Sequence, residues 1–224
     1  MIELVRRIGR VPGVGLAWRE RWWLVAFAAL VVLCRLPNVG GWDDAFYVGQ
    51  LTSALGDRDL RLQDDVVLVP RSFPEKCRIL TTVLPSGALV NSFSIGPALI
   101  LSPFTAPVVA RASPPPWLPF RVVAALAAMG LLVVTAFVCL RTVVRFGVRR
   151  DAAALATGLA LLSSPLALYA TRYTLGAHTW GGLLLALTLR QALAWVESRR
   201  TRDAAGLGLA AGLACVNRWP DAVV

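Results

Sequence analysis

Long runs of apolar residues, separated by short charged segments, dominate the sequence of 224 residues. The apolar runs cover residues 22–37, 122–140, 152–171, 173–189 with a continuation to 196, and 204–217. Those at 122–140, 152–171 and 173–189 come close to the ~20 residues that an α-helix needs to cross a hydrocarbon core about 30 Å thick. The pattern therefore predicts an all-α polytopic membrane protein, a helical bundle with about five transmembrane helices.

One more uncharged stretch, at 91–110, is interrupted by three prolines. If this stretch crossed the membrane, the arginines at 141–150 and the trio at 199–202 would both face the outside. If it does not cross, both groups lie in the cytoplasm together with the basic N-terminus, as the positive-inside rule requires. Prolines also interrupt a spanning helix. We therefore expect a re-entrant or interfacial segment here.

The first transmembrane helix is followed by one large external loop. The predicted segments are a cytoplasmic basic N-terminus (1–21), the first transmembrane helix (22–38), the external loop (39–119), four further transmembrane helices (120–217) and an external end (218–224). Within the loop, Pro85-Ser86-Gly87 separates residues 79–84 from 88–93, which predicts two short strands joined by a turn. Because the chain stops just beyond Pro220, we expect a truncated protein.

Composition and charge agree with a lipid environment. Hydrophobic residues make up 57% of the chain and charged residues 16%, against about 45–50% and ~25% in soluble domains. The net charge of +10 would suit nucleic acid, but the arginines are spread over short segments between apolar runs. A nucleic-acid-binding surface instead collects basic residues on one soluble face. We expect membrane lipids and no nucleic acid as partners, in a multi-pass protein of the inner (plasma) membrane with a cytoplasmic N-terminus.

An acidic pair, Asp43-Asp44, follows the first apolar run directly. Val48, Leu51 and Leu55 then recur at helical spacing, which predicts a surface helix through Leu55. One aspartate could cap that helix. Two adjacent carboxylates at the edge of the bilayer are costly unless they are solvated or used. The alternative is a base, or a metal-supported base, that accepts the proton of an acceptor hydroxyl.

Several further segments follow this pair in order. They are Leu55-Gly56-Asp57-Arg58-Asp59-Leu60-Arg61-Leu62, Asn91-Ser92-Phe93-Ser94-Ile95-Gly96-Pro97-Ala98-Leu99 with Ser102-Pro103-Phe104, Ser163-Ser164-Pro165-Leu166-Ala167-Leu168-Tyr169, Ala177-His178, and Gly208-Leu209-Ala210-Ala211-Gly212-Leu213 with Asn217-Arg218-Trp219. The ordered set resembles the GT-C membrane glycosyltransferases, the group of protein mannosyltransferases and aminoarabinose transferases. The resemblance runs from about residue 20 to the end. The family's pair is most often Asp-Glu, and its members usually continue through several further spans.

The resemblance implies transfer of a sugar from a polyprenyl-phosphate donor to an acceptor hydroxyl on the outer face, with inversion at the sugar carbon. It makes Asp43 the base, while Asp44 orients the acceptor or helps to hold a divalent cation. No other cofactor is implied, and neither the sugar nor the acceptor, whether glycan, lipid or protein, is identified. The sequence has no Gly-rich phosphate loop of the nucleotide-sugar type, which agrees with a lipid-linked donor.

Four more residues are candidates for substrate binding. Arg172 could hold the donor phosphate, because a guanidinium matches phosphate bidentately, or it could be an interfacial arginine that reaches the headgroups. His178, the only histidine, could contact donor or acceptor, or hydrogen-bond at a helix start. Tyr47 could stack on a sugar, or be an ordinary interfacial tyrosine. Arg218 is a second candidate cation.

Two other functions fit the same pattern. A transporter or flippase would place charges or broken helices at the membrane midplane, whereas this chain concentrates its acidic residues in the loop at 39–91. A non-catalytic fragment is the other alternative, because missing spans would complete the cavity of the enzyme.

Overall fold

The computed structural model describes residues 18–33, 42–58, 82–83, 85, 89–90, 95–109, 117–173 and 177–217. Its helices are α2 (Trp18–Leu33), α3 (Trp42–Thr52) with the π-helical turn η1 (Ser53–Asp57), α6 (Gly96–Val109), α7 (Trp117–Arg145), α8 (Arg150–Leu162), α9 (Pro165–Thr171), α10 (Ala177–Ser198) and α11 (Thr201–Asn217). Two strands, β1 (Thr82–Val83) and β2 (Leu89–Val90), complete these elements. The prediction of an all-α fold is confirmed for the described residues, with one small hairpin added.

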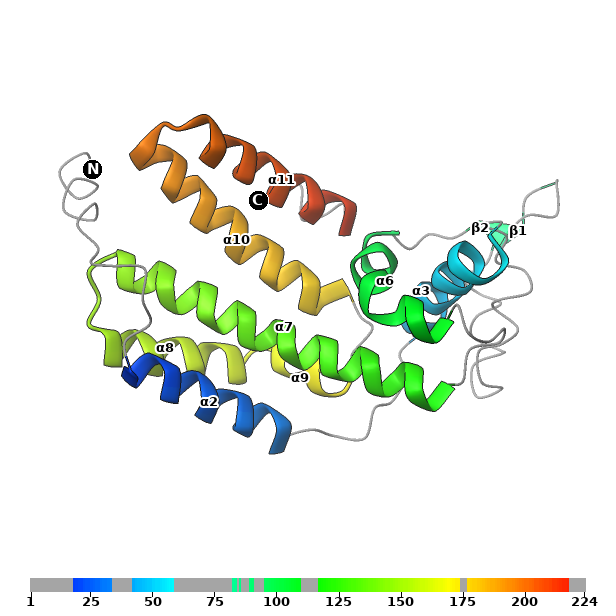
Figure 1. Cartoon of the computed structure of the whole chain (residues 1–224), viewed down its shortest axis with the longest axis horizontal. Coiled ribbons are helices and arrows are strands. Elements are labelled where there is room, and N and C mark those ends of the chain that lie inside the picture. The colour runs from blue at the N-terminus through cyan, green and yellow to red at the C-terminus, as the bar shows by residue number, and fades with distance from the viewer. Residues whose placement is uncertain are drawn as a thin grey trace.

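Helix α7 is the central element of the bundle. It packs against α2, α8 and α9 on one side and α10 on the other, and α11 packs on α10 (Figure 1). Helices α6 and α3 lie at the end where α7 begins, and α6 contacts α7, α3, α10 and α11 (Figure 1). The opposite end carries the start of α2, the α7–α8 turn and the α10–α11 turn (Figure 1). The basic segments that the structure describes therefore gather at one end of the bundle.

Two apolar clusters hold these helices together. One joins α2, α7, α8 and α9 through buried residues that include Phe27, Leu132 and Leu161. The other joins α3, α6, α7 and α10 through Leu51, Leu101 and Trp180 among others. Ala124 and Ala136, the buried α7 alanines of these clusters, have no exposed surface, and such small residues allow helix backbones to approach closely in membranes.

Large apolar side chains cover the outward faces of the same helices. More than half of the surface is exposed for residues on four different helices: Val25, Leu126, Leu155, Leu159 and Leu209. A water-soluble monomer rarely exposes so much apolar surface in contiguous patches. One described helix segment, Val122–Arg145 within α7, is long and apolar enough to cross a membrane, and the bent pair α8–α9 would count as a second. These features support membrane association, while the five-span arrangement stays a prediction.

The expected single span at 152–171 is in fact two helices. Helices α8 and α9 meet at an angle of 68°. Pro165 occupies the first turn of α9 and disfavours a helical conformation at the residue before it. Ser164 caps α9 by accepting a hydrogen bond of 3.2 Å from the backbone N–H of Leu166. The break therefore has a local cause, a Ser-Pro sequence inside an uninterrupted apolar run.

Helix α6 lies within the uncharged, proline-interrupted stretch at 91–110. Its 14 residues would span only about 21 Å at 1.5 Å per residue, less than the ~30 Å hydrocarbon core. Pro103 lacks the N–H that would bond the carbonyl of Leu99, and the Ser102 hydroxyl donates to that carbonyl instead at 2.8 Å. Helix α6 is therefore too short for a straight span, and its re-entrant or interfacial placement stays a prediction.

The predicted strands and turn are confirmed. Strands β1 and β2 pair antiparallel, with Thr82 opposite Val90 and Val83 opposite Leu89. Pro85 lies in the connecting turn.

Candidate functional site

The acidic pair begins helix α3. Because α3 starts at Trp42, Asp43 and Asp44 both belong to its first turn, where a carboxylate interacts favourably with the helix dipole. Their side chains lie outside the described part of the structure, so both the capping and the base interpretations stay predictions. Helix α3 itself continues through η1 to Asp57, which confirms the predicted helix through Leu55.

Tyr47 lies one turn after the acidic pair. Only 3% of its surface is exposed, as is 2% of Leu51 on the same face of α3. This face packs on α6. A sugar could therefore stack on the Tyr47 ring only after neighbouring side chains moved, and burial in the protein accounts for its position as it stands.

Arg172 and His178 come together at the corner between α9 and α10. The His178 ring stacks on Tyr169 with centroids 4.0 Å apart and an interplanar angle of 24°. Tyr169 also contacts Tyr173 at 5.9 Å, and the Arg172 guanidinium lies 5.7 Å from the Tyr173 ring centroid. Of the predicted site residues, His178 thus forms one aromatic cluster with Tyr169 and Tyr173, and Arg172 lies beside this cluster.

Tyr169 was not predicted as a site residue. It is the last residue of the segment Ser163–Tyr169 that contributes to the family resemblance. Its position in the sequence could have identified it, because Tyr169 lies close to Arg172 and His178 around the same predicted helix end.

The Arg172 side chain is half-buried, and its Nε atom is buried without a hydrogen-bond partner among the residues that the structure describes. Thr179 Oγ1 and Trp180 Nε1, in the first turn of α10, are buried without a partner in the same sense. Buried polar atoms are nearly always hydrogen-bonded in proteins, because leaving one unpaired costs about 1–3 kcal/mol. Of these atoms, the Arg172 Nε lies beside the aromatic cluster and can donate to an oxygen-rich ligand there, whereas Trp180 packs in the apolar cluster with α3, α6 and α7.

A close contact between α6 and α11 fixes the start of α10. Gly96 lies against the backbone of Asn217, where a Cβ atom would come within 2.6 Å of its nitrogen. Asn217 is fully buried, and its Nδ2 donates a hydrogen bond of 3.0 Å to the carbonyl of Ala177, the residue before His178. Gly96 and Asn217 therefore act as positioning residues for this corner. Arg218, which follows Asn217, lies outside the described residues.

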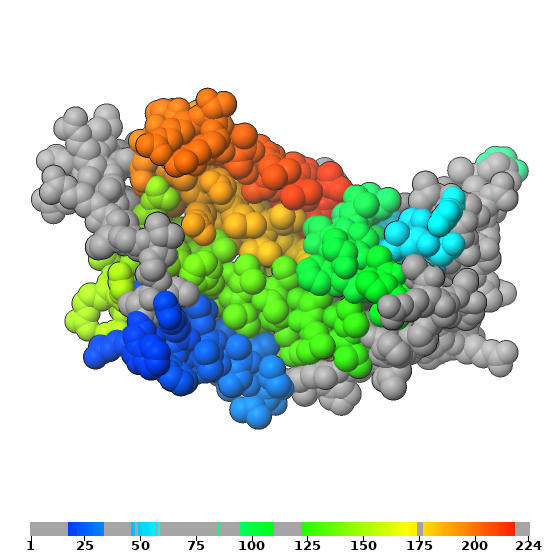
Figure 2. Space-filling model, in the orientation of Figure 1, coloured from blue at the N-terminus to red at the C-terminus, as the bar shows by residue number. Residues whose placement is uncertain are grey.

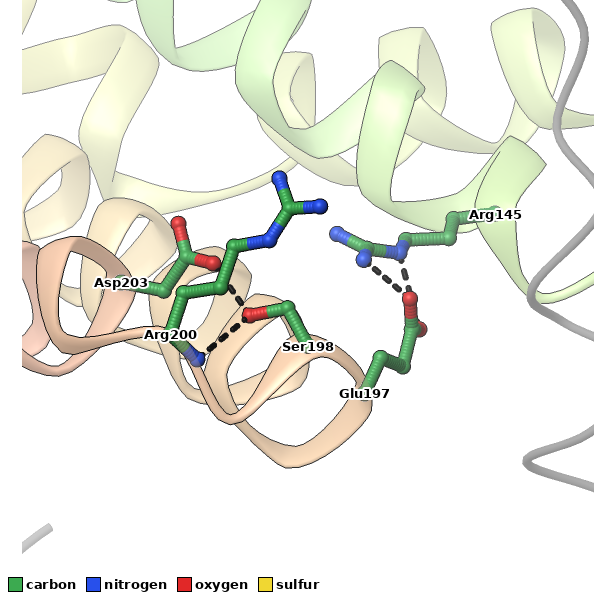
Figure 3. A network of polar contacts seen from close by, with 5 residues as sticks. All are labelled: Arg145, Glu197, Ser198, Arg200 and Asp203. Carbon is green, nitrogen blue, oxygen red and sulfur yellow. Dashed lines mark hydrogen bonds and ion pairs between the residues drawn. The ribbon is translucent and has the colours of Figure 1, made fainter.

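The opposite end of the bundle contains ion pairs that were not predicted. Glu20 is 4% exposed, and its carboxylate lies 3.7 Å from Arg141 and 3.4 Å from Arg150. The guanidinium of Arg145 pairs with both oxygens of Glu197, with Nε 2.9 Å from Oε1 (Figure 3). An isolated acid among the basic segments, as at position 20, is the sequence signal for such a pair.

The turn between α10 and α11 is closed by polar contacts beside that pair. The Ser198 hydroxyl donates to Asp203 and accepts from the backbone N–H of Arg200 at 3.1 Å (Figure 3). Arg199 adopts a left-handed conformation with φ 53° and lies over Trp195. The contacts are local to the turn and account for the polar residues there without a ligand.

Metal binding receives no support from the described side chains. Among them, no three His, Cys, Asp or Glu residues come together as a metal site would need. The two aspartates that were expected to hold a divalent cation are not among these side chains, so that expectation stays a prediction.

Comparison with known proteins adds no relative. No family model, no curated protein and no solved structure matches this chain.

Proposed function

We propose that this chain is a multi-pass membrane glycosyltransferase that transfers a sugar from a polyprenyl-phosphate donor to an acceptor hydroxyl. The observation that carries the proposal is the corner between α9 and α10, where the buried Nε of Arg172 has no partner among the described residues beside the stacked rings of His178 and Tyr169. A guanidinium binds phosphate with charge-assisted hydrogen bonds. Aromatic rings suit the apolar faces of a sugar.

The two ends of the bundle support the orientation of the proposed enzyme. Described arginines at the start of α2, around the α7–α8 turn and around the α10–α11 turn gather at one end: Arg19, Arg21, Arg145, Arg149, Arg150, Arg199, Arg200 and Arg202. The positive-inside rule makes this the cytoplasmic end. The Arg172 corner and the first turn of α3 are then at the outer face, where a donor's phosphate lies at the interface and its isoprenoid tail lies among the helices.

The proposed reaction is a single displacement. Asp43 accepts the proton of the acceptor hydroxyl while that oxygen forms a bond to the anomeric carbon. The bond between the anomeric carbon and the phosphate oxygen breaks, its electron pair stays with the polyprenyl phosphate, and the configuration inverts. Arg172 stabilises the charge on the departing phosphate. Asp44 orients the acceptor.

Donor binding can be measured separately from transfer. Farnesyl phosphate, a short polyprenyl phosphate, should bind the purified chain at least ~10-fold more weakly after Arg172→Gln, because a hydrogen bond to a charged group contributes about 1.5–3 kcal/mol. Arg58→Gln is the matched control, since Arg58 is exposed and lies at the end of η1, on the side of the bundle that carries α3. Equal affinities for the wild type and Arg172→Gln would remove Arg172 from the proposal.

Transfer tests the base. Asp43→Asn should lower sugar transfer at least ~10²-fold, the lower end for loss of a general base, and leave farnesyl phosphate binding unchanged. Asparagine keeps the size and the capping ability of aspartate, so a purely structural Asp43 predicts unchanged transfer. Asp44→Asn should lower transfer less. Equal, severe losses at both positions would instead indicate a shared metal site.

A transporter or flippase is the second candidate, favoured by the 68° break between α8 and α9. Transporters use broken helices to bind substrate with free backbone groups and charges. Here Ser164 accepts from the N–H of Leu166 at 3.2 Å and donates to the carbonyl of Leu161 at 2.7 Å. The break is thus occupied by its own serine and carries no charge, which favours the enzyme.

A further inference from the structure

A pocket of about 740 Å³ lies at the basic end of the bundle, between the first turns of α2 and α8. Trp18, Arg19 and Glu20 line it from α2, and Arg149, Arg150 and Leu155 line it from the start of α8. Figure 2 shows α8 (yellow-green) beside α2 (blue) at this edge of the molecule. The helix starts that line it lie at the end of the bundle opposite α3 and α6, away from the α9–α10 connection (Figure 1).

The charges around the pocket leave cationic groups available. Glu20, the buried acid of the lining, already forms ion pairs with Arg150 and with Arg141, which is not part of the lining. Arg19 and Arg149 are exposed and form no ion pair with the residues that the structure describes. Asp151 is the other acid of the lining, so three arginines face two carboxylates there. The pocket therefore attracts an anion.

An apolar surface begins directly beside these arginines. Leu155 is 63% exposed and Leu159, one turn further along α8, is 61% exposed. Val25 on α2 is 56% exposed at a similar depth along its helix. Trp18, at the pocket rim, has 68% of its surface exposed, and tryptophan prefers the boundary between lipid and water. The pocket thus joins cationic groups to an adjoining apolar surface, the two features that a lipid headgroup and its acyl chains need.

The start of α8 offers further donors to an anion. No side chain caps this helix, because the residue before it, Arg149, makes no side-chain hydrogen bond to the first turn. The first backbone N–H groups of a helix have no partner within the helix and point toward its N-terminal end. Together with the helix dipole they favour a phosphate group at this position.

We propose that this pocket binds the phosphate headgroup of an anionic glycerophospholipid. Arg19 and Arg149 contact the phosphate, the first backbone N–H groups of α8 donate hydrogen bonds to it, and one acyl chain lies along Leu155 and Leu159. Basic pockets between membrane helices on the cytoplasmic side are a known kind of site for anionic headgroups. The lipid would join α2 to α8 at the membrane surface. This site depends on membrane insertion but not on sugar transfer.

The test uses the purified full chain in a neutral detergent and native mass spectrometry with added lipid. Phosphatidylglycerol with eight-carbon chains should bind saturably, at least ~10-fold more tightly than phosphatidylcholine with the same chains. The double variant Arg19→Gln and Arg149→Gln should bind phosphatidylglycerol about 25-fold more weakly, at roughly fivefold for each arginine near a membrane surface. Both residues are exposed, so circular dichroism should show unchanged helix content.

The matched control is the double variant Arg200→Gln and Arg202→Gln. These arginines are exposed and lie at the same end of the bundle, but they do not line the pocket. Their substitution removes the same amount of charge as the first double variant. Unchanged affinity in this control supports a defined site. Equal losses in the two double variants would show a diffuse basic surface and overturn the proposal. Binding of inorganic phosphate as tight as that of phosphatidylglycerol would identify a soluble anion site and overturn the lipid assignment.

Discussion

Replacing Gly96 by alanine tests the joint that holds the α9–α10 corner. Gly96 begins α6 and lies against the last turn of α11. A Cβ atom at this position would come 2.5 Å from the carbonyl oxygen of Val216 and 2.6 Å from the nitrogen of Asn217, and closer still to its Cα atom. All three are backbone atoms, so no side-chain rotation can relieve the overlap.

The magnitude follows from these distances. Ordinary contacts of a Cβ atom begin at about 3.4 Å, so α6 must move away from α11 by roughly 1 Å. Such overpacking typically costs 1–3 kcal/mol in a well-packed interior. We expect a loss of about 2 kcal/mol in the stability of the packed bundle. The Asn217 hydrogen bond to Ala177 should also lengthen, because Asn217 is the residue displaced.

Thermal unfolding in detergent measures the first effect, with Gly208→Ala as the control. Gly208 lies within α11, and a Cβ atom there would meet nothing within 4 Å. Because alanine is favoured over glycine in a helix by about 0.5–1 kcal/mol, Gly208→Ala should be neutral or stabilising. Farnesyl phosphate binding should weaken only in Gly96→Ala. Equal melting temperatures for Gly96→Ala and the wild type would show that α6 does not contact α11 as described.

Three other perturbations give independent tests. Glu20→Gln should destabilise the bundle by about 2 kcal/mol in thermal unfolding, less than the 3–5 kcal/mol of a fully buried pair because the Arg150 side chain is 40% exposed. Arg202→Gln, which removes the exposed partner of Asp203, should change stability by under ~0.5 kcal/mol, and equal effects of the two substitutions would contradict the role of Glu20. Gly147→Ala should cost about 1 kcal/mol, because Gly147 has φ +81° and open space around it, so only backbone strain is added; an unchanged melting temperature would contradict that turn. Cys77, in the predicted external loop, should be the only cysteine labelled by an impermeant thiol reagent added outside intact cells, and labelling only after the inner face is opened would reverse the orientation.

Much of the helical architecture was readable from the sequence because a buried or lipid-facing helix needs an uninterrupted apolar run. The run at 122–140 lies within α7, and the run at 204–217 matches α11 within a few residues. The break between α8 and α9 was missed for the same reason, since apolar residues continue on both sides of it. Its cause, Ser164 followed by Pro165, is a conformational signal that is independent of hydropathy.

The candidate site was readable only where its residues are near in sequence. Arg172 and His178 flank one corner of the chain, so a predicted helix end brings them together. Gly96 and Asn217 meet across more than a hundred residues, as do Glu20 and Arg150. Hydrophobic periodicity indicates which face of each helix is buried. It does not indicate which helices are neighbours, so these long-range contacts could not be predicted from one sequence.

The polar groups at the two ends of the bundle are arranged in opposite ways. At the basic end, the buried carboxylate of Glu20 lies between two arginines and the half-buried Glu197 pairs with Arg145, so both acids have partners. At the α9–α10 corner, Arg172, Thr179 and Trp180 each bury a polar atom that has no partner in the described residues. Thr157, on α8, is another side chain with a buried polar atom that has no partner among the described residues. Proteins rarely leave such atoms unpaired unless a ligand, ion or water satisfies them. The ion-paired acids of the basic end therefore need no ligand, whereas the α9–α10 corner keeps buried donors that are available to an oxygen-rich group.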